Sequence, residues 1–210
     1  MSGSVDNLKW RYAVKKFDHN KILPKEKIEI LKAAFNLSAT SYGLQPYKLV
    51  ILKNKKLQEQ LVEYSWNQKQ VAQASHVFII AIQKEISTKD VESYFKLVKK
   101  IRNTPDHIIN PFKEMLTNDI ANRTKEELHH WMKNQAYIAL GTLMTVAANE
   151  KIDSCPMEGF VSAKYDELLG LDTLNLRSVL VLPIGIRAED CFMKDLKKVR
   201  KKMDDVIIEM

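Results

Sequence analysis

Two stretches of the chain are nearly continuous runs of apolar residues at the length of a β-strand, SHVFIIAI at 75–82 and LRSVLVLPIGIR at 176–187. Such runs are typical of strands that are buried on both faces of a sheet. YKLVILKN at 47–54 and the short run IDSCPM at 152–157 predict two further strands. We expect the last of them to end at a turn formed by Glu158 and Gly159.

Helical periodicity fills much of the sequence between these strands. The segment 24–38 begins with proline and spaces Ile28, Leu31 and Phe35 along one face, which predicts an amphipathic helix. Shorter helices are predicted from Asp6, over 56–65 and over 160–171. Helices packed on a mixed sheet place the chain in the α+β or α/β class.

The longest predicted helix spans 124–151. It opens with Thr124 and Glu127 at the spacing of a capping box. Its second half is apolar nearly all the way round, which indicates burial on every side. A helix of about 25 residues is about 37 Å long, more than a small domain usually buries alone. We therefore expect a second subunit to cover part of it.

Residues 84–126 differ in character from the rest of the chain, because they are charged and only weakly apolar. We expect helices inserted outside the main core, acting as a lid within a single domain over 1–210. Phe112 and Met115 are three residues apart and share a helix face, so they are candidates to line a substrate pocket. The alternative is that both side chains pin the helix to the core.

Composition and charge narrow the class of protein. The chain has 210 residues, 45% of them hydrophobic, and a formal net charge of +7. The positive charge favours an anionic partner, either nucleic acid, an acidic membrane surface or a phosphate-bearing small molecule. The N-terminus lacks the apolar segment of a signal peptide, and the longest low-polarity run, 136–148, is short of the roughly 20 residues of a membrane span. These features predict a cytoplasmic protein with reduced thiols at Cys155 and Cys191.

The candidate chemistry lies in two basic clusters, at Lys9–Lys16 and at 197–200. If the fold brings Arg11 and Lys15 close to Arg200, the clusters form a pocket for a phosphate dianion; otherwise they are solvated tails. Glycine-rich nucleotide loops, a serine nucleophile motif and a metal-ligand set are absent from the sequence. An enzyme with such a sequence needs a cofactor to carry the reaction.

Six segments in order resemble the FMN-dependent NAD(P)H nitroreductases, in the oxygen-insensitive nitroreductase and flavin reductase branch. They are RYAVKKFD (11–18), SATSYGLQPYKLVI (38–51), NQKQVAQASHV (67–77), WMKNQAYIALG (131–141), IDSCPMEGF (152–160) and KKVR (197–200). The resemblance implies an α+β fold, a mixed sheet flanked by helices in a domain-swapped homodimer. It also implies FMN as cofactor, NADH or NADPH as co-substrate, and no nucleic-acid or membrane partner.

The resemblance implies a ping-pong oxidoreductase. Hydride passes from NAD(P)H through flavin N5 to a small-molecule acceptor such as a nitroaromatic, a quinone or a flavin. No side chain is expected to act as acid or base, and the Glu158 backbone is expected beside N5. The implied cofactor-binding residues are Arg11, Tyr12, Ala13, Lys15, Ala39, Thr40, Ser41, Gly43, Asn67, Gln70, Pro156, Met157, Glu158, Gly159, Lys198 and Arg200. Of these, the loop at 38–41 is expected to come from the partner subunit.

The sequence departs from the family pattern at three places. Tyr12-Ala13 replaces a frequent His-Ser pair, Tyr42-Gly43-Leu44 replaces Thr-Asn-Ser, and Gln70 stands where lysine is common. A neutral amide at Gln70 stabilises an anionic reduced flavin less than an ammonium does. The changes at 42–44 and Gln70 leave open a flavin-binding protein for storage or sensing. The net charge of +7 and the lysine-rich tail leave open a second alternative, a basic nucleic-acid-binding protein.

Overall fold

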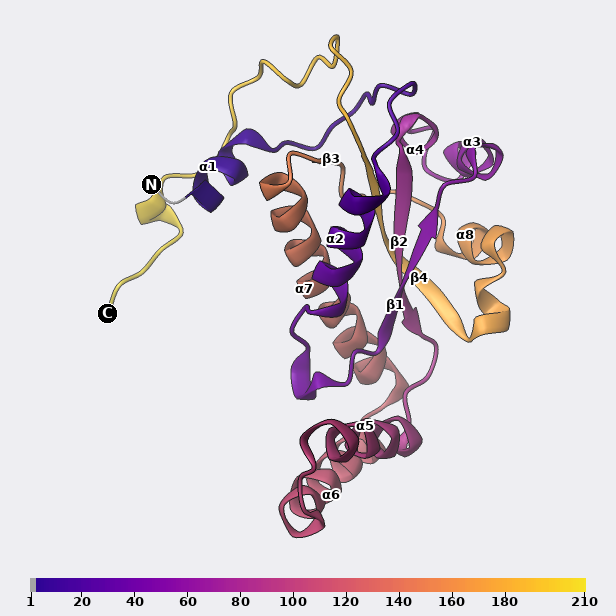
Figure 1. Cartoon of the computed structure of the whole chain (residues 1–210), viewed down its shortest axis with the longest axis vertical. Helices are drawn as coiled ribbons and strands as arrows, with labels where there is room; N and C mark the ends of the chain where they lie inside the picture. Colours follow the sequence, from indigo (N-terminus) through magenta and orange to yellow (C-terminus); the bar gives the residue numbers. More distant parts are fainter. Residues whose placement is uncertain (1–2) are drawn as a thin grey trace.

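A four-stranded sheet forms the centre of the computed structural model, which describes residues 3–210 (Figure 1). The strands are β1 (Tyr47–Leu52), β2 (His76–Gln83), β3 (Asp153–Ser154) and β4 (Leu176–Gly185), in the spatial order β1-β2-β4-β3. All three strand pairs are antiparallel. A bridge between Ala13 and Ser154 adds a parallel pairing. The expected α+β class is confirmed.

Helices lie on both faces of this sheet and beyond its ends. They are α1 (Gly3–Trp10), α2 (Lys25–Asn36), α3 (Lys55–Glu63), α4 (Gln70–Gln73), α5 (Thr88–Arg102), α6 (Asp106–Asn122), α7 (Lys125–Asn149) and α8 (Ser162–Leu169). Short 3₁₀ turns are η1 (Ser41–Gly43), η2 (Leu171–Leu174) and η3 (Met203–Asp205). Helices α2 and α7 cover one face, and α3 and α8 lie on the other (Figure 1).

Strand β2 is buried on both faces, as its apolar run predicts. Phe78 and Ile80 join the core cluster that includes residues of α2 and α7, whereas Val77 and Ile79 join a second cluster with residues of α3 and α8. The alternation follows from the two-residue period of a strand. The central strands therefore form a rigid support for the segments at their ends.

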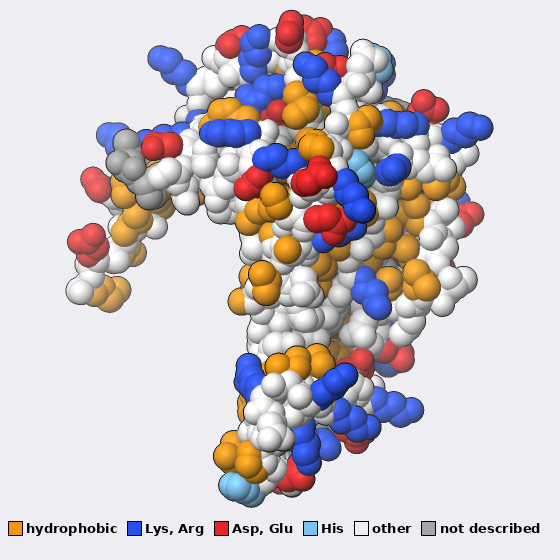
Figure 2. Space-filling model, viewed as in Figure 1, with side chains coloured by type: hydrophobic (Ala, Val, Ile, Leu, Met, Phe, Trp, Pro, Cys, Tyr) orange, Lys and Arg blue, Asp and Glu red, His pale blue; other side chains and the backbone are white. Residues whose placement is uncertain are grey.

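Helix α7 begins at the predicted capping box, where Thr124 and Glu127 bond each other's backbone. Burial on every side is not reached within one chain, because Tyr137 is 37% and Ile138 47% exposed, and the expectation that a second subunit covers this part stays a prediction. Hydrophobic side chains lie on the flank of the body that carries α2 and α7 (Figure 2). Part of the apolar surface of α7 is thus exposed to solvent in the single chain.

The segment 84–126 forms helices α5 and α6, which lie beyond one end of the sheet (Figure 1). Their buried residues, including Phe95 and Leu116, belong to the main core cluster, so the insertion packs against the body. Lysine and arginine side chains crowd its outer surface (Figure 2). At the opposite end, α1 and the C-terminal segment project together to one side (Figure 1).

Candidate functional site

The two ends of the chain build a cavity of about 530 Å³ between them. Arg11, Lys198 and Arg200 all line it, as do Tyr12, Ala13 and Pro156. The Lys198 ammonium donates a hydrogen bond to the Arg11 carbonyl, which ties the C-terminal segment to the N-terminal one. Of the two alternatives for the basic clusters, the structure thus favours the one in which they meet, through Arg11, Lys198 and Arg200, whereas Lys15 is not among the residues that line the cavity.

Electrostatics at this cavity favour an anion. Burial lowers the pKa of Arg11, and the charge of Arg200 lowers it further. Burial also lowers the pKa of Lys198, with added repulsion from Arg11 and Arg200. The buried Nε of Arg11 has no hydrogen-bond partner among residues 3–210. A phosphate would satisfy this donor and relieve the repulsion among three cations, so these residues fit the phosphate end of a flavin mononucleotide.

Beside the cavity, side chains from two separate segments converge on Cys155. The Lys15 ammonium lies 3.7 Å from the Cys155 sulfur, and the Gln70 amide nitrogen lies 3.9 Å from it. The same amide nitrogen is 3.8 Å from the sulfur of Met157. Burial raises the pKa of the Cys155 thiol, which opposes formation of a thiolate. The structure thus brings Lys15 and Gln70 together around a neutral thiol.

The turn at Glu158 and Gly159 carries a contact that the sequence did not predict. A Cβ on Gly159 would lie 2.7 Å from the Trp66 ring, a distance that forces one of them to move. Trp66 and Asn67 both have positive φ, and Trp66 is 70% exposed. Close packing by Trp66 is therefore a reason for glycine at 159 within this chain. Asn67 is exposed beside it.

The loop that contains Ala39, Thr40, Ser41 and Gly43 lies far from this cavity within one chain. Its Ser41 N–H donates to Gln135 Oε1 at 2.8 Å, in the first half of α7. The N-terminal segment instead reaches the other end of α7, where Asn7 bonds Asn149 at 3.0 Å. Asn149 lies 14 positions after Gln135 in α7, which corresponds to about 21 Å along the helix axis. One chain therefore does not bring this loop to the phosphate-type cavity.

Phe112 and Met115 are 40% and 46% exposed, so neither is a core residue. Residues Ile109, Leu116 and Ile120 anchor α6 instead. The Phe112 ring lies 5.5 Å from Phe95 and 6.2 Å from Tyr42, between ring centroids. Phe112 thus contacts both the buried Phe95 and the loop at 39–43, so the pocket role and the packing role of this side chain remain alternatives.

Sequence reasoning missed the residues that hold the N-terminal segment in place. Arg187 stacks against the rings of Trp10 and Tyr12 and pairs with the buried Asp153. No short-range pattern links these positions, since they are separated by up to 177 residues. The pairing depends on the path of β3 and β4.

The described residues 3–210 lack two further features. None of their helices is both long and apolar enough to cross a membrane. Their His, Cys, Asp and Glu side chains form no group of three that suits a metal ion.

Fold and site together define an α+β protein with an anion cavity built by both termini. Comparison with known sequences gives the family: the chain belongs to the nitroreductase family, whose model matches residues 8–186. It is therefore an enzyme of an oxidoreductase family. A protein of Staphylococcus epidermidis that bears an NAD(P)H nitroreductase name is 35% identical, over 97% of this chain and 94% of its own. A similarly named protein of Staphylococcus haemolyticus is 34% identical, with 97% and 95% covered.

Solved structures share the fold. A nitroreductase structure from Bacillus subtilis has a TM-score of 0.87 at 18% identity, and 98% of each chain is covered. A structure from Exiguobacterium sibiricum, described as a nitroreductase in complex with FMN, has a TM-score of 0.83 at 20% identity, covering 100% of this chain and 98% of that one. At these identities the likeness establishes the architecture alone.

Proposed function

We propose that this chain is an FMN-dependent oxidoreductase that uses NADH or NADPH to reduce nitroaromatic, quinone or flavin-type acceptors. FMN, when bound, supplies the capacity to accept a hydride and pass it on. The observation that carries the proposal is the convergence of Arg11, Lys198 and Arg200 on one cavity, with the Arg11 Nε left unpartnered. Family membership and the names of the relatives support the same conclusion.

In this proposal, the three cations hold the phosphate of FMN, and Tyr12, Ala13 and Pro156 border the cavity. Lys15 and Gln70 supply donors to the ring from one side, because their nitrogens converge at Cys155. Asn67 and the segment Met157–Gly159 border the ring from the other. The Glu158 backbone N–H is the proposed donor beside flavin N5, and no side chain serves as acid or base.

The co-substrate and the acceptor occupy the same face in turn, which makes the mechanism ping-pong. The chain contributes binding, orientation and exclusion of water. The buried Gln70 is neutral where an ammonium would favour a negative ring. We expect this substitution to lower the flavin's reduction potential relative to a lysine at the same position.

A homodimer completes the site in this proposal. The loop of Ala39, Thr40, Ser41 and Gly43 lies about 21 Å along α7 from the end that carries the cavity, so it reaches a flavin on a second subunit. The exposed apolar flank of α7 supports such an interface. Segment 84–126 is then a lid, and Phe112 and Met115 line the acceptor pocket.

Substitution of Arg200 tests the proposed cofactor site. Charge-assisted hydrogen bonds contribute about 1.5–3 kcal/mol each, so Arg200→Ala should weaken FMN binding roughly 10- to 150-fold. Fluorescence titration of the apoprotein with FMN measures this. Lys201→Ala, an exposed neighbour in the same tail, is the matched control and should bind as the parent does. An unchanged dissociation constant in Arg200→Ala would reject the assignment.

A further inference from the structure

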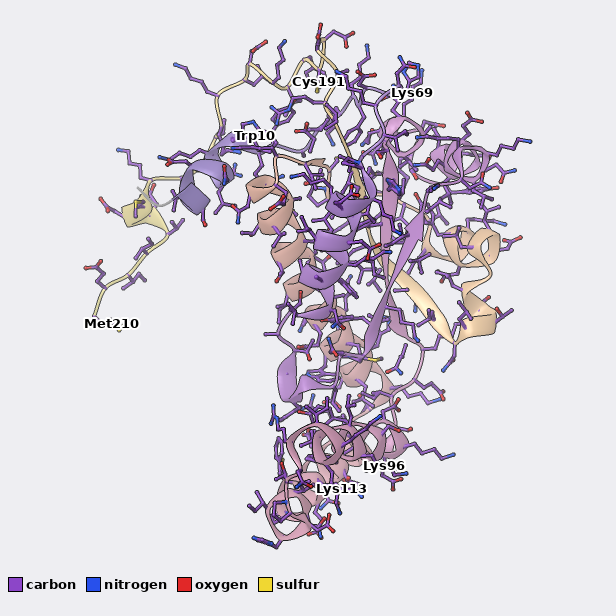
Figure 3. All side chains as sticks on the ribbon, in the orientation of Figure 1. Trp10, Lys69, Lys96, Lys113, Cys191 and Met210 are labelled. Carbon is purple, nitrogen blue, oxygen red and sulfur yellow. The ribbon has the colours of Figure 1, made fainter. Side chains whose placement is uncertain are left out.

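Arg187 directly touches both neighbours of Arg11. Its guanidinium carbon lies 4.4 Å from the ring centroid of Trp10 and 4.5 Å from that of Tyr12. Guanidinium groups stack well on aromatic rings because they are planar and weakly hydrated. Trp10 lies at the end of α1 where the N-terminal segment meets the body (Figure 3). Arg187 therefore holds the chain on either side of a residue that lines the anion cavity.

A buried ion pair fixes Arg187 to the edge of the sheet. Asp153, which is 4% exposed, accepts from the Arg187 Nε at 2.8 Å and from its backbone N–H at 2.8 Å. The Arg187 Nη2 lies 2.5 Å from the same carboxylate. Asp153 belongs to β3 and pairs with Gly185 of β4. The strand pairing therefore leaves Asp153, and the Arg187 side chain bound to it, little freedom to move. The guanidinium is thus a rigid surface for the two rings.

The N-terminal segment has further anchors on either side of Arg11. No residue of α1 is buried, and this helix is held by Asn7, which bonds Asn149 at 3.0 Å, and by the Lys151 ammonium, which lies 5.0 Å from the centroid of the Trp10 ring. The backbone is held at Ala13 by its bridge to Ser154 and at Val14 by a hydrogen bond of 3.2 Å to the Ser154 carbonyl. Trp10, Arg11 and Tyr12 all line the cavity, where Arg200 repels the Arg11 guanidinium. The contacts of Arg187 with the rings on either side of Arg11 limit the movement of this stretch.

We propose that Arg187 is a positioning residue for the phosphate clamp: held by Asp153, it stacks on Trp10 and Tyr12 and thereby keeps Arg11 directed at the phosphate of FMN. The inference rests on the proposed function, since it needs the cavity to hold that phosphate. Arg187 is not among the residues that line the cavity, so its substitution acts through the segment 10–12 that it holds.

The test compares FMN with riboflavin, which lacks the phosphate. The variants are Arg187→Leu, Arg187→Lys and Trp10→Leu, with Arg177→Leu as a control at an exposed arginine of β4. Loss of the two stacking contacts should weaken FMN binding by about 5- to 30-fold in Arg187→Leu. Trp10→Leu, which changes no charge, should show a smaller loss of the same kind. Riboflavin binding should stay within about twofold in every variant.

Each alternative has its own outcome. Full recovery of FMN affinity in Arg187→Lys would mean that charge alone matters and would overturn positioning by stacking. Equal losses for FMN and riboflavin would mean that Arg187 supports the whole site, which also overturns it. If Arg187→Leu does not fold, Trp10→Leu decides, because it keeps the ion pair with Asp153.

The Arg200→Ala variant tests the proposed function itself, through its relative affinity for FMN and riboflavin. If that variant leaves the FMN-to-riboflavin affinity ratio unchanged, the cavity does not bind the phosphate. If Arg200→Ala lowers the ratio and Arg187→Leu does not, only the positioning role is rejected. In a double variant, Arg187→Leu should add little to Arg11→Ala, since both act through the same group.

Discussion

At the scale of single residues, glycine at position 159 is favoured for two separate reasons, a close approach to a ligand and packing within the chain. A turn glycine permits close approach to a flat ring, which is the role that the resemblance implies. In the folded chain the Trp66 ring already occupies the place of a side chain at 159, within 2.7 Å of an added Cβ. A side chain at this position would therefore have to displace the exposed Trp66 ring, even before any ligand binds.

His76 gives a prediction about the dependence of stability on pH. It is buried at the start of β2, with its Nδ1 2.9 Å from the Ser75 hydroxyl. Burial lowers its pKa, and the charges of Lys53, Lys55 and Lys32 add to this effect. The unfolded chain, with an ordinary histidine pKa of about 6.5, then binds the proton more readily. The contribution to stability is present above that pH and is lost as pH falls.

We expect the free energy of unfolding to decline as pH falls from about 7 to 5, and His76→Asn to flatten this decline. Urea unfolding at a series of pH values measures both curves. The exposed His107→Asn is the control and should follow the parent protein. Parallel curves for the parent and His76→Asn would contradict the assignment.

At the scale of elements, the pair α5–α6 and the turn η1 form one unit. Gly43, with φ of +78°, leaves room for Tyr94 of α5, whose hydroxyl would lie 2.7 Å from an added Cβ. Tyr42 in the same turn faces Phe112 of α6. A movement of α5 and α6 would therefore displace the loop at 39–43, which we assign to the flavin of the partner subunit.

Phe112→Ala tests the lid. Removal of an aromatic contact of about 0.5–1.5 kcal/mol should change kcat/KM for aromatic acceptors roughly 2- to 10-fold, with flavin content unchanged. Steady-state assays with nitroaromatic and quinone acceptors measure this. Ile108→Ala, at a 59% exposed position of the same helix, is the control. Identical kinetics across several acceptors would remove Phe112 from the pocket, and joint loss of flavin and folding would indicate a core role.

At the scale of the whole molecule, the proposed site is divided between the two ends of α7. The cavity lies near Asn149, and the loop at 39–43 lies near Gln135. Between them, Ile138 is 47% exposed. Two chains related by a twofold axis would place the loop of each near the cavity of the other, and would cover this apolar flank.

The dimer prediction is tested at Ile138. An obligate interface buries about 2,000 Å² or more, so a charge at its centre should separate the subunits. We expect Ile138→Glu to sediment as a monomer at micromolar concentration and to lose FMN. Leu174→Glu, a 61% exposed leucine of η2, should remain dimeric. A parent protein that is a stable, FMN-loaded monomer would disprove the dimer.

The sequence by itself determined the elements whose signals are local. The apolar run at 75–82, the spacing of Ile28, Leu31 and Phe35, and the cap at Thr124 depend on neighbours in the chain, and all appear in the structure. The ordered motifs also supplied the family, which the family match confirms. The grouping of Arg11, Lys198 and Arg200 was expected only by resemblance.

Tertiary structure decided the contacts between distant segments. The stack of Trp10, Arg187 and Tyr12, the packing of Trp66 on Gly159, and the exposure of one flank of α7 all depend on how the sheet places remote residues. Periodicity shows which face of a helix is apolar, because side-chain direction repeats along it. What that face meets is set by the path of the whole chain, and for α7 that path leaves an apolar flank uncovered within one subunit.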